Sequence, residues 1–151
     1  MKKYIYIFLL LPFFLCGSTI YKKQLPIIQL SIYEIAEQVT GAPANILKAI
    51  AIVESNENDS AIGDDGISMG RMQINELYRE ERVSKYGDYN PFDALDSVIL
   101  SGHIYMANFN IFKDHDKAIA AHRQGRRGVL KYGATKWYVD RVRNAMEAKE
   151  E

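Results

Sequence analysis

The sequence predicts a mainly helical, single-domain fold with at most a small β-hairpin near residues 61–74. The chain has 151 residues, the length of one ordinary domain, and 48% of them are hydrophobic, which is enough to form one core. Apolar side chains recur at helical spacing in several segments, whereas signals typical of strands are few. We expect the domain to cover residues 31–146, followed by a charged tail at residues 147–151.

Residues 1–18 have the pattern of a signal peptide. Lys2 and Lys3 give a positive start, an uncharged apolar run follows, and Cys16-Gly17-Ser18 supplies the small residues that a signal peptidase requires. We therefore expect cleavage after this segment and an exported domain, located in the periplasm or cell envelope or secreted. Residues 19–30 are expected to form a linker.

Two alternatives for the N-terminal segment stay open. Residues 1–20 could act as an uncleaved membrane anchor, because no charge follows Lys3 until Lys22. Cys16 could instead be acylated as in a lipoprotein, although the bulky Leu15 before it argues against acylation. In every case the only expected membrane contact is through residues 1–20, and the domain lies outside the cytoplasm.

The composition excludes several classes of protein. Cys16 is the only cysteine, so the mature domain can form no internal disulfide. Removal of residues 1–18 lowers the basic residues from 19 to 17 against 19 acidic ones, so we expect no nucleic-acid partner. We also expect no metal and no cofactor, because residues 56–66 lack the EF-hand spacing and the three histidines have no zinc-type spacing.

Helix signals begin at the start of the predicted domain. Ser31 and Glu34 have the spacing of a capping box, which predicts a helix that ends at Gly41. A proline then opens a second helix, over about residues 43–55. Residues 56–66 are rich in Asn, Asp, Ser and Gly, which predicts a polar loop with tight turns.

Further helices are predicted in the second half of the chain. One starts at Asn90-Pro91 and is expected to be buried and central. Asp116 is suited to cap a short helix that ends at Gly125, and Thr135 is suited to cap a last helix. The apolar positions of the central helix recur at helical spacing: Phe92, Leu95, Ile99, Gly102, Met106 and Phe109.

Glu54 occupies an unusual place on the second helix. Leu47 and Ile50 precede it on the apolar face, at spacings of three and four. A carboxylate therefore stands where a core residue is expected, and burial and the negative end of the helix dipole both favour its protonated form. A general acid for glycosidic cleavage requires such a group. On spacing alone, a structural glutamate at a helix end is the simpler interpretation.

The residues that follow Glu54 favour the catalytic interpretation. The helix ends in Glu54-Ser55, and the polar loop leads to Gly66-Ile67-Ser68-Met69-Gly70-Arg71-Met72-Gln73-Ile74. Together these two segments resemble the lytic transglycosylases of the lysozyme-like superfamily, in which a helix ending in Glu-Ser precedes a Gly-x-Ser-x-Gly-x-Met-Gln-Ile stretch. The resemblance implies a lysozyme-like α+β fold.

The resemblance continues downstream and covers about residues 32–142. Gly102, Tyr105 and Met106 are similar to the family's Gly-x-x-Tyr-Leu pattern on its central helix. The closing Tyr-Val-x-x-Val pattern of the family has its counterpart in Tyr138-Val139-Asp140-Arg141-Val142.

Two departures from the family concern its site. Val98 replaces an asparagine on the central helix, which affects one supporting hydrogen bond. His122 and Arg123 replace the tyrosine and asparagine of the family's Ala-Tyr-Asn-x-Gly segment, where the tyrosine lies near the glutamate and helps to hold the substrate. His122 either does a similar job, in which case activity depends on pH near 6–7, or has no role.

The resemblance implies cleavage of the β-1,4 bond between N-acetylmuramic acid and N-acetylglucosamine in peptidoglycan glycan strands. Glu54 would protonate the glycosidic oxygen and then take a proton from the muramic 6-hydroxyl, so that a 1,6-anhydro ring closes without water. A lysozyme-type muramidase is the closest alternative and would need a second carboxylate about 5–9.5 Å away. Asp59, Asp64 and Asp65 are the candidates, although Asp-Asp-Gly also suits a turn.

The expected substrate-binding residues lie in three segments. Gly70 would let the chain turn tightly beside the sugar, and Ser68 and Gln73 could hydrogen-bond to it. Tyr138 is suited either to the cleft or to the core, and the same is true of Met72. The full set is Ser68, Gly70, Met72, Gln73, His122 and Tyr138.

Two further hypotheses concern partners. The basic stretch Arg123, Arg126, Arg127 and Lys131 is typical of a solvated face but could also attract the acidic stem peptides of peptidoglycan. A catalytically silent peptidoglycan-binding component of an envelope assembly is the alternative from another class of protein. The small size of the domain suggests that a secretion-system or flagellar partner localises it.

Overall fold

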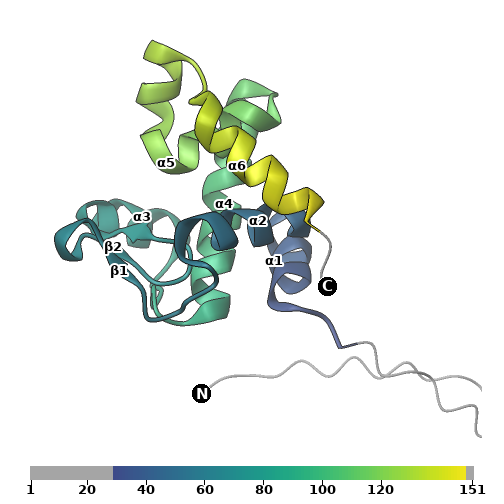
Figure 1. Ribbon diagram of the computed structural model, residues 1–151. Coiled ribbons are helices and arrows are strands. Elements are labelled where there is room, and N and C mark those ends of the chain that lie inside the picture. The colour runs from purple at the N-terminus through teal and green to yellow at the C-terminus, as the bar shows by residue number, and fades with distance from the viewer. Residues whose placement is uncertain (1–28, 149–151) are drawn as a thin grey trace, which may run out of the picture.

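The computed structural model describes residues 29–148 and is mainly helical, as predicted (Figure 1). The predicted signal peptide, residues 19–28 of the predicted linker and residues 149–151 lie outside the described residues. The helices are α1 (Ile32–Thr40), α2 (Ala44–Ser55), α3 (Arg79–Tyr86), α4 (Ala94–Phe112), α5 (His115–Tyr132) and α6 (Lys136–Glu147). The short elements are β1 (Ile62–Gly63), η1 (Asp64–Gly66), β2 (Ser68–Met69), β3 (Ile74–Asn75) and η2 (Glu76–Tyr78).

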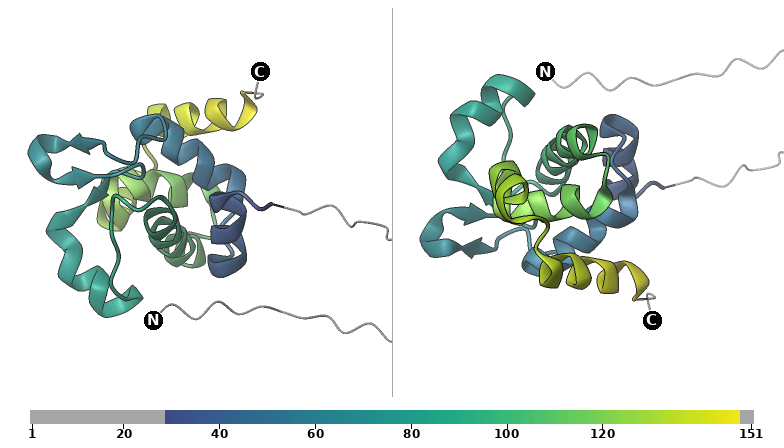
Figure 2. Two further views of the ribbon diagram at one scale, coloured as in Figure 1. Left: turned by 90° about the horizontal axis from the view of Figure 1, so that it is seen from below. Right: turned by 90° about the horizontal axis from the view of Figure 1, so that it is seen from above.

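The helices pack around α4, which runs through the middle of the domain. It contacts α1 and α5, while α2 packs against α6 and α1. Figure 2 shows α4 nearly end-on, between the other helices and a lobe that holds the sheet and α3. Within residues 29–148, no helix is both long enough and apolar enough to cross a membrane.

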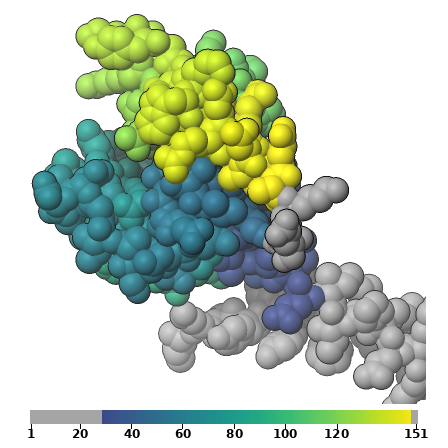
Figure 3. Space-filling model, viewed as in Figure 1, coloured from purple at the N-terminus to yellow at the C-terminus, as the bar shows by residue number. Residues whose placement is uncertain are grey.

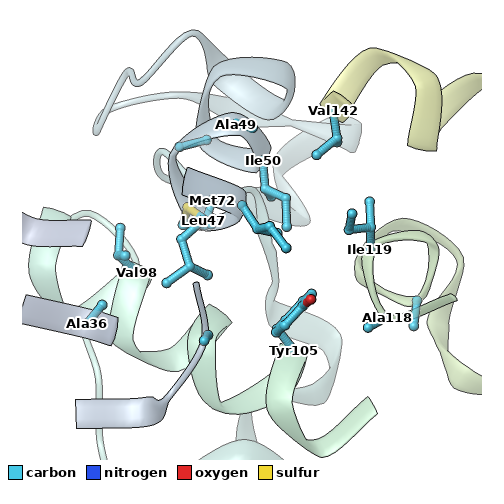
Figure 4. Close-up of a cluster of buried hydrophobic side chains, with 14 of the residues drawn as sticks. Ala36, Leu47, Ala49, Ile50, Met72, Val98, Tyr105, Ala118, Ile119 and Val142 are labelled. Carbon is cyan, nitrogen blue, oxygen red and sulfur yellow. The ribbon is translucent and has the colours of Figure 1, made fainter. Parts of the chain in front are cut away.

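One hydrophobic core joins the helices. Leu47 and Ile50 of α2 are at most 1% exposed and point into the space between the helices in Figure 4. They meet Val98 of α4, Ile119 of α5 and Val142 of α6 in the same buried cluster. Val98, which replaces the family's asparagine, is therefore a core residue with no exposed surface.

The first two helices begin and end where the sequence predicts. The Ser31 hydroxyl accepts a hydrogen bond from the Glu34 backbone N–H, and the Glu34 carboxylate accepts one from the Ser31 N–H at 2.7 Å, which completes the capping box. Gly41 ends α1 in the left-handed region at φ 79°. Helix α2 ends at Ser55 because Asn56 is left-handed at φ 55°.

The predicted hairpin is present and extends to a third strand. Strands β1, β2 and β3 form an antiparallel sheet in that order, with Met69 of β2 paired to Ile62 on one side and to Ile74 on the other. The turn between β2 and β3 includes Gly70 at φ 71°. A Cβ added to Gly70 would lie 1.7 Å from the Pro91 carbonyl oxygen, so only glycine fits here.

The predicted start of the central helix is wrong, and its predicted buried face is correct only in part. Asp93 caps α4 by accepting hydrogen bonds from the backbone N–H groups of Leu95 and Asp96, so the helix begins at Ala94 and not at Asn90-Pro91. Phe92 consequently lies outside the helix and is 40% exposed. Of the predicted face, Gly102 is buried, and Ile99, Met106 and Phe109 are partly buried against the core. The buried residues of α4 are Ser97, Val98, Leu100, Ser101, Gly102, Tyr105 and Asn108.

Two further details differ in the second half of the chain. Asp114, not Asp116, caps α5 by accepting a hydrogen bond from the Lys117 N–H, because Asp116 lies inside the first turn. The helix breaks at Gly125, at φ 70° and ψ 161°, as predicted, but a further helical segment follows to Tyr132. Helix α3 was not predicted, because Val83 and Tyr86 are its only apolar residues and both are only partly buried.

Candidate active site

Glu54 lies in the last turn of α2, where the core gives way to the surface. Its side chain is 12% exposed, whereas Leu47 and Ile50 on the same face are almost fully buried. The Tyr138 hydroxyl, from α6, donates a hydrogen bond of 2.5 Å to Glu54 Oε1. This bond joins two residues that are 84 positions apart in sequence and fixes one carboxylate oxygen.

Tyr138 is 1% exposed and remains protonated. Burial raises its pKa far above the ordinary value, and the negative charge of Glu54 and the hydrogen bond to it act in the same direction. The phenol is therefore a permanent hydrogen-bond donor to Glu54. Because Oε1 accepts this bond, Oε2 is the oxygen left to meet a substrate.

His122 of α5 is the second polar side chain beside Glu54. Its Nε2 lies 3.0 Å from the Met72 carbonyl oxygen and 4.0 Å from Glu54 Oε1. A carbonyl oxygen only accepts hydrogen bonds, so Nε2 carries the ring proton and donates a hydrogen bond to the Met72 carbonyl oxygen. The side chain is 10% exposed, so His122 presents an N–H edge to both the glycine-rich segment and the carboxylate.

The glycine-rich segment is tied to the end of α2 and to itself. The Ser55 hydroxyl donates to the Arg71 carbonyl oxygen at 2.8 Å, which holds the segment against the residue next to Glu54. The Gln73 amide donates to the Gly70 carbonyl oxygen at 3.0 Å, and the Ser68 hydroxyl donates to Asp64 at 2.7 Å. These side chains therefore hold the shape of the segment in this structure.

The predicted site residues fall into two groups. Glu54, His122 and Tyr138 come together, with the backbone carbonyl of Met72 as a fourth contributor. The Met72 side chain has no exposed surface and belongs to the core. Ser68, Gln73 and Gly70 lie in the segment alongside, where their contacts are made with the chain itself.

The candidates for a second carboxylate are engaged or exposed. Asp59 accepts two hydrogen bonds from the Arg71 guanidinium, at 2.6 and 3.1 Å. Asp64 accepts the Ser68 hydroxyl, and Asp65 is an exposed residue in a left-handed conformation at φ 54°. These contacts agree with the structural alternative for the aspartates, which is turn formation and loop anchoring.

Arg71 is the centre of a polar cluster that sequence analysis missed. Besides Asp59, it donates to the Tyr33 hydroxyl at 2.8 Å and to Glu57 at 3.4 Å. Tyr33, on α1, donates in turn to Glu57 at 2.5 Å, and its burial raises its pKa. The cluster joins α1, the polar loop and the glycine-rich segment. A lone arginine in a segment preceded by an acidic loop was the signal that could have revealed it.

A groove of about 780 Å³ opens beside the Glu54–Tyr138–His122 cluster. His122 lies in its wall, Gln73, Ile74 and Asn75 line it from the sheet, and Asn108 lines it from α4. The space-filling view shows the surface indented between the lobe of residues 62–86 and the C-terminal helices (Figure 3). Glu54 and Tyr138 do not line the groove themselves, and His122, 4.0 Å from Glu54 Oε1, is the residue of the cluster that does.

The fold and this cluster define a lysozyme-like helical domain with one nearly buried carboxylate beside a groove. A family model described as the transglycosylase SLT domain matches residues 31–140. Since the match covers most of the chain, the chain belongs to this family. No curated protein matches the sequence. Membership implies a transglycosylase domain that acts on peptidoglycan.

Replacement of Arg71 tests whether its cluster holds the loop in place. Arg71→Gln leaves Asp59 and Tyr33 without a charged donor, so we expect the free energy of unfolding to fall by about 2 kcal/mol in urea denaturation. The matched control is Arg143→Gln, which breaks an exposed pair with Asp116 and should cause no measurable change. Equal losses in both variants would contradict an anchoring role for Arg71.

Proposed function

We propose that this domain is an exported lytic transglycosylase that cleaves the bond between N-acetylmuramic acid and N-acetylglucosamine and leaves a 1,6-anhydro end. The single observation that carries the proposal is the position of Glu54. It is a mostly buried carboxylate that is oriented by the Tyr138 hydroxyl and lies 4.0 Å from His122, a residue that lines the groove, within a family that acts on peptidoglycan.

The first chemical step uses the protonated form of Glu54. Its proton passes from Oε2 to the glycosidic oxygen as the bond from that oxygen to C1 of the muramic residue breaks, and the N-acetylglucosamine portion leaves as an alcohol. The substrate's own N-acetyl group is suited to stabilise the positive charge that develops at C1. Tyr138 contributes by fixing Oε1, so that Oε2 faces the bond to be cleaved.

In the second step the same residue acts as a base. The Glu54 carboxylate takes the proton of the muramic 6-hydroxyl while that oxygen bonds to C1, which closes the anhydro ring and restores the acid. No water enters, and one carboxylate serves both steps. The N–H of His122 is donated to Met72, and with Nε2 4.0 Å from Oε1 the ring is close enough to stabilise the ionised carboxylate electrostatically between the steps.

The environment of the aspartates supports transglycosylation over hydrolysis. A hydrolase of the usual kind needs a second carboxylate free to act as a nucleophile or to activate water. Asp59 accepts hydrogen bonds from Arg71, and Asp64 accepts one from Ser68. The two polar side chains beside Glu54 are a tyrosine and a histidine, not a second carboxylate. This arrangement fits a mechanism in which the substrate supplies the nucleophile.

The cellular setting rests on the sequence. The signal-peptide pattern of residues 1–18 supports export to the periplasm or cell envelope. We propose peptidoglycan strands as the main partner, with a secretion-system or flagellar component as a second partner that localises the enzyme.

The mass of the products tests the proposed reaction. Purified protein should release muropeptides lighter by one water than those of a muramidase, and Glu54→Gln should lower the rate at least a hundredfold, roughly the contribution of a general acid–base catalyst. Glu54→Gln keeps the shape and can still accept the Tyr138 hydrogen bond, so circular dichroism should show an unchanged fold.

Two results of the product analysis would contradict the proposal. Hydrated reducing ends would identify a muramidase and direct attention to the aspartates of the loop. Binding of peptidoglycan without any product, from both the wild type and Glu54→Gln, would identify a catalytically silent wall-binding component.

The Tyr138 hydroxyl provides a second test. Tyr138→Phe keeps the buried ring but removes the donor, so we expect kcat to fall by about tenfold, the equivalent of one hydrogen bond to a charged group. Tyr105→Phe is the matched control, because its hydroxyl contacts His115 instead of Glu54. An unchanged kcat in Tyr138→Phe, or the same loss in both variants, would contradict an orienting role for Tyr138.

A further inference from the structure

The groove is lined by positive charge from two separate parts of the chain. Arg82 and Lys85, on α3, lie on one wall, and Arg123, Arg126 and Arg127, on α5, lie on the other. Glu81 is the one acidic residue among the lining residues. The whole chain carries no net charge, so this concentration is a local feature of the groove.

These five cations have no acidic partner among residues 29–148. Several basic residues outside the groove are paired with an acid: Arg71 with Asp59, Arg79 with Glu76, and Arg143 with Asp116. Unpaired like charges that face one another across a concave surface repel each other and concentrate a positive potential between them. Such a groove attracts an anionic ligand.

Neutral contacts hold several of these side chains in place. Arg126 donates to Asn108 Oδ1 at 3.1 Å, and Asn108 itself is 4% exposed. The Arg123 guanidinium stacks 4.8 Å from the centre of the Trp137 ring. On the opposite wall, Arg82 donates to the Asn75 carbonyl oxygen. These contacts use few of the five N–H donors of each arginine and leave the charge available to a ligand.

We propose that the groove binds the carboxylates of the stem peptides on the glycan strand, so that the enzyme prefers stems with free carboxylates over amidated stems. This inference rests on the proposed function, since a strand whose cleaved bond reaches Glu54 passes along the wall that holds His122. The sugars of such a strand are uncharged, and its negative charges lie on the stem peptides. Arginine matches a carboxylate geometrically and electrostatically.

Matched substrates make the inference testable on the full chain. The first substrate is uncrosslinked peptidoglycan strands, and the second is the same strands after carbodiimide coupling to ammonia, which turns carboxylates into amides at unchanged length. Both kcat/KM and the Kd of fluorescently labelled strands are measured at low ionic strength, where charges are least screened. We expect the wild type to prefer the free-carboxylate strands by about tenfold in both quantities, the sum of several exposed charge contacts.

The variant removes one cation from each wall without breaking a hydrogen bond. Lys85→Gln/Arg127→Gln should reduce the preference to about threefold or less, because the remaining contacts are fewer. Lys117→Gln/Lys136→Gln is the matched control, since both lysines lie outside the groove lining and the change in net charge is the same. The control should keep the preference of the wild type.

Three results would overturn the inference: no preference in the wild type, a full preference in Lys85→Gln/Arg127→Gln, or an equal reduction in the control. A fourth contradicting result would come from the Kd of strands stripped of their peptides, whose only carboxylates are those of the lactyl groups. If they bind as tightly as intact strands, the peptides are not the ligand. Failure of the proposed function is distinguishable, because a protein that cleaves neither substrate still reports its preference through Kd.

Discussion

The hydrogen bond between Tyr138 and Glu54 is the contact on which the rest of the site depends. A carboxylate on the buried face of a helix is unfavourable unless its oxygens are satisfied, and Tyr138 satisfies Oε1 from a helix near the other end of the domain. The bond requires α2 and α6 to pack closely, which Ile50 and Val142 in the shared core allow. The geometry of the candidate site is therefore a consequence of how the helices pack around the core.

A second constraint places the glycine-rich segment next to the carboxylate. The Ser55 hydroxyl binds the backbone of Arg71, and the Arg71 side chain binds the polar loop and α1. The segment is therefore anchored through both the backbone and the side chain of Arg71. The close approach of Gly70 to Pro91 fixes the other side. With the segment in place, the Met72 carbonyl oxygen receives the His122 N–H and sets the orientation of the ring. The proposed roles of Glu54, Tyr138 and His122 follow from this rigid frame.

Local signals in the sequence were sufficient for much of the fold. The capping box at Ser31, the break at Gly125 and the four-residue spacing from Ile50 to Glu54 act within a few residues, and these features occur as predicted. Choices between neighbouring caps, such as Asp114 and Asp116, depend on the tertiary fit of the helix and were predicted wrongly. Helix α3 has only two apolar residues, Val83 and Tyr86, so neither the helix nor its part in the basic groove could be predicted from periodicity. The convergence of Glu54, His122 and Tyr138 required the family resemblance, because nothing local joins positions so far apart.

The central claim is that the substrate, not water, supplies the nucleophile to the bond that Glu54 cleaves. Digestion of peptidoglycan in water enriched in oxygen-18, followed by mass spectrometry of the new muramic ends, tests this claim most directly. A transglycosylase incorporates none of the label, because the ring closes through the 6-hydroxyl of the sugar. Incorporation of one labelled oxygen at each new end would contradict the account and show that water enters the reaction.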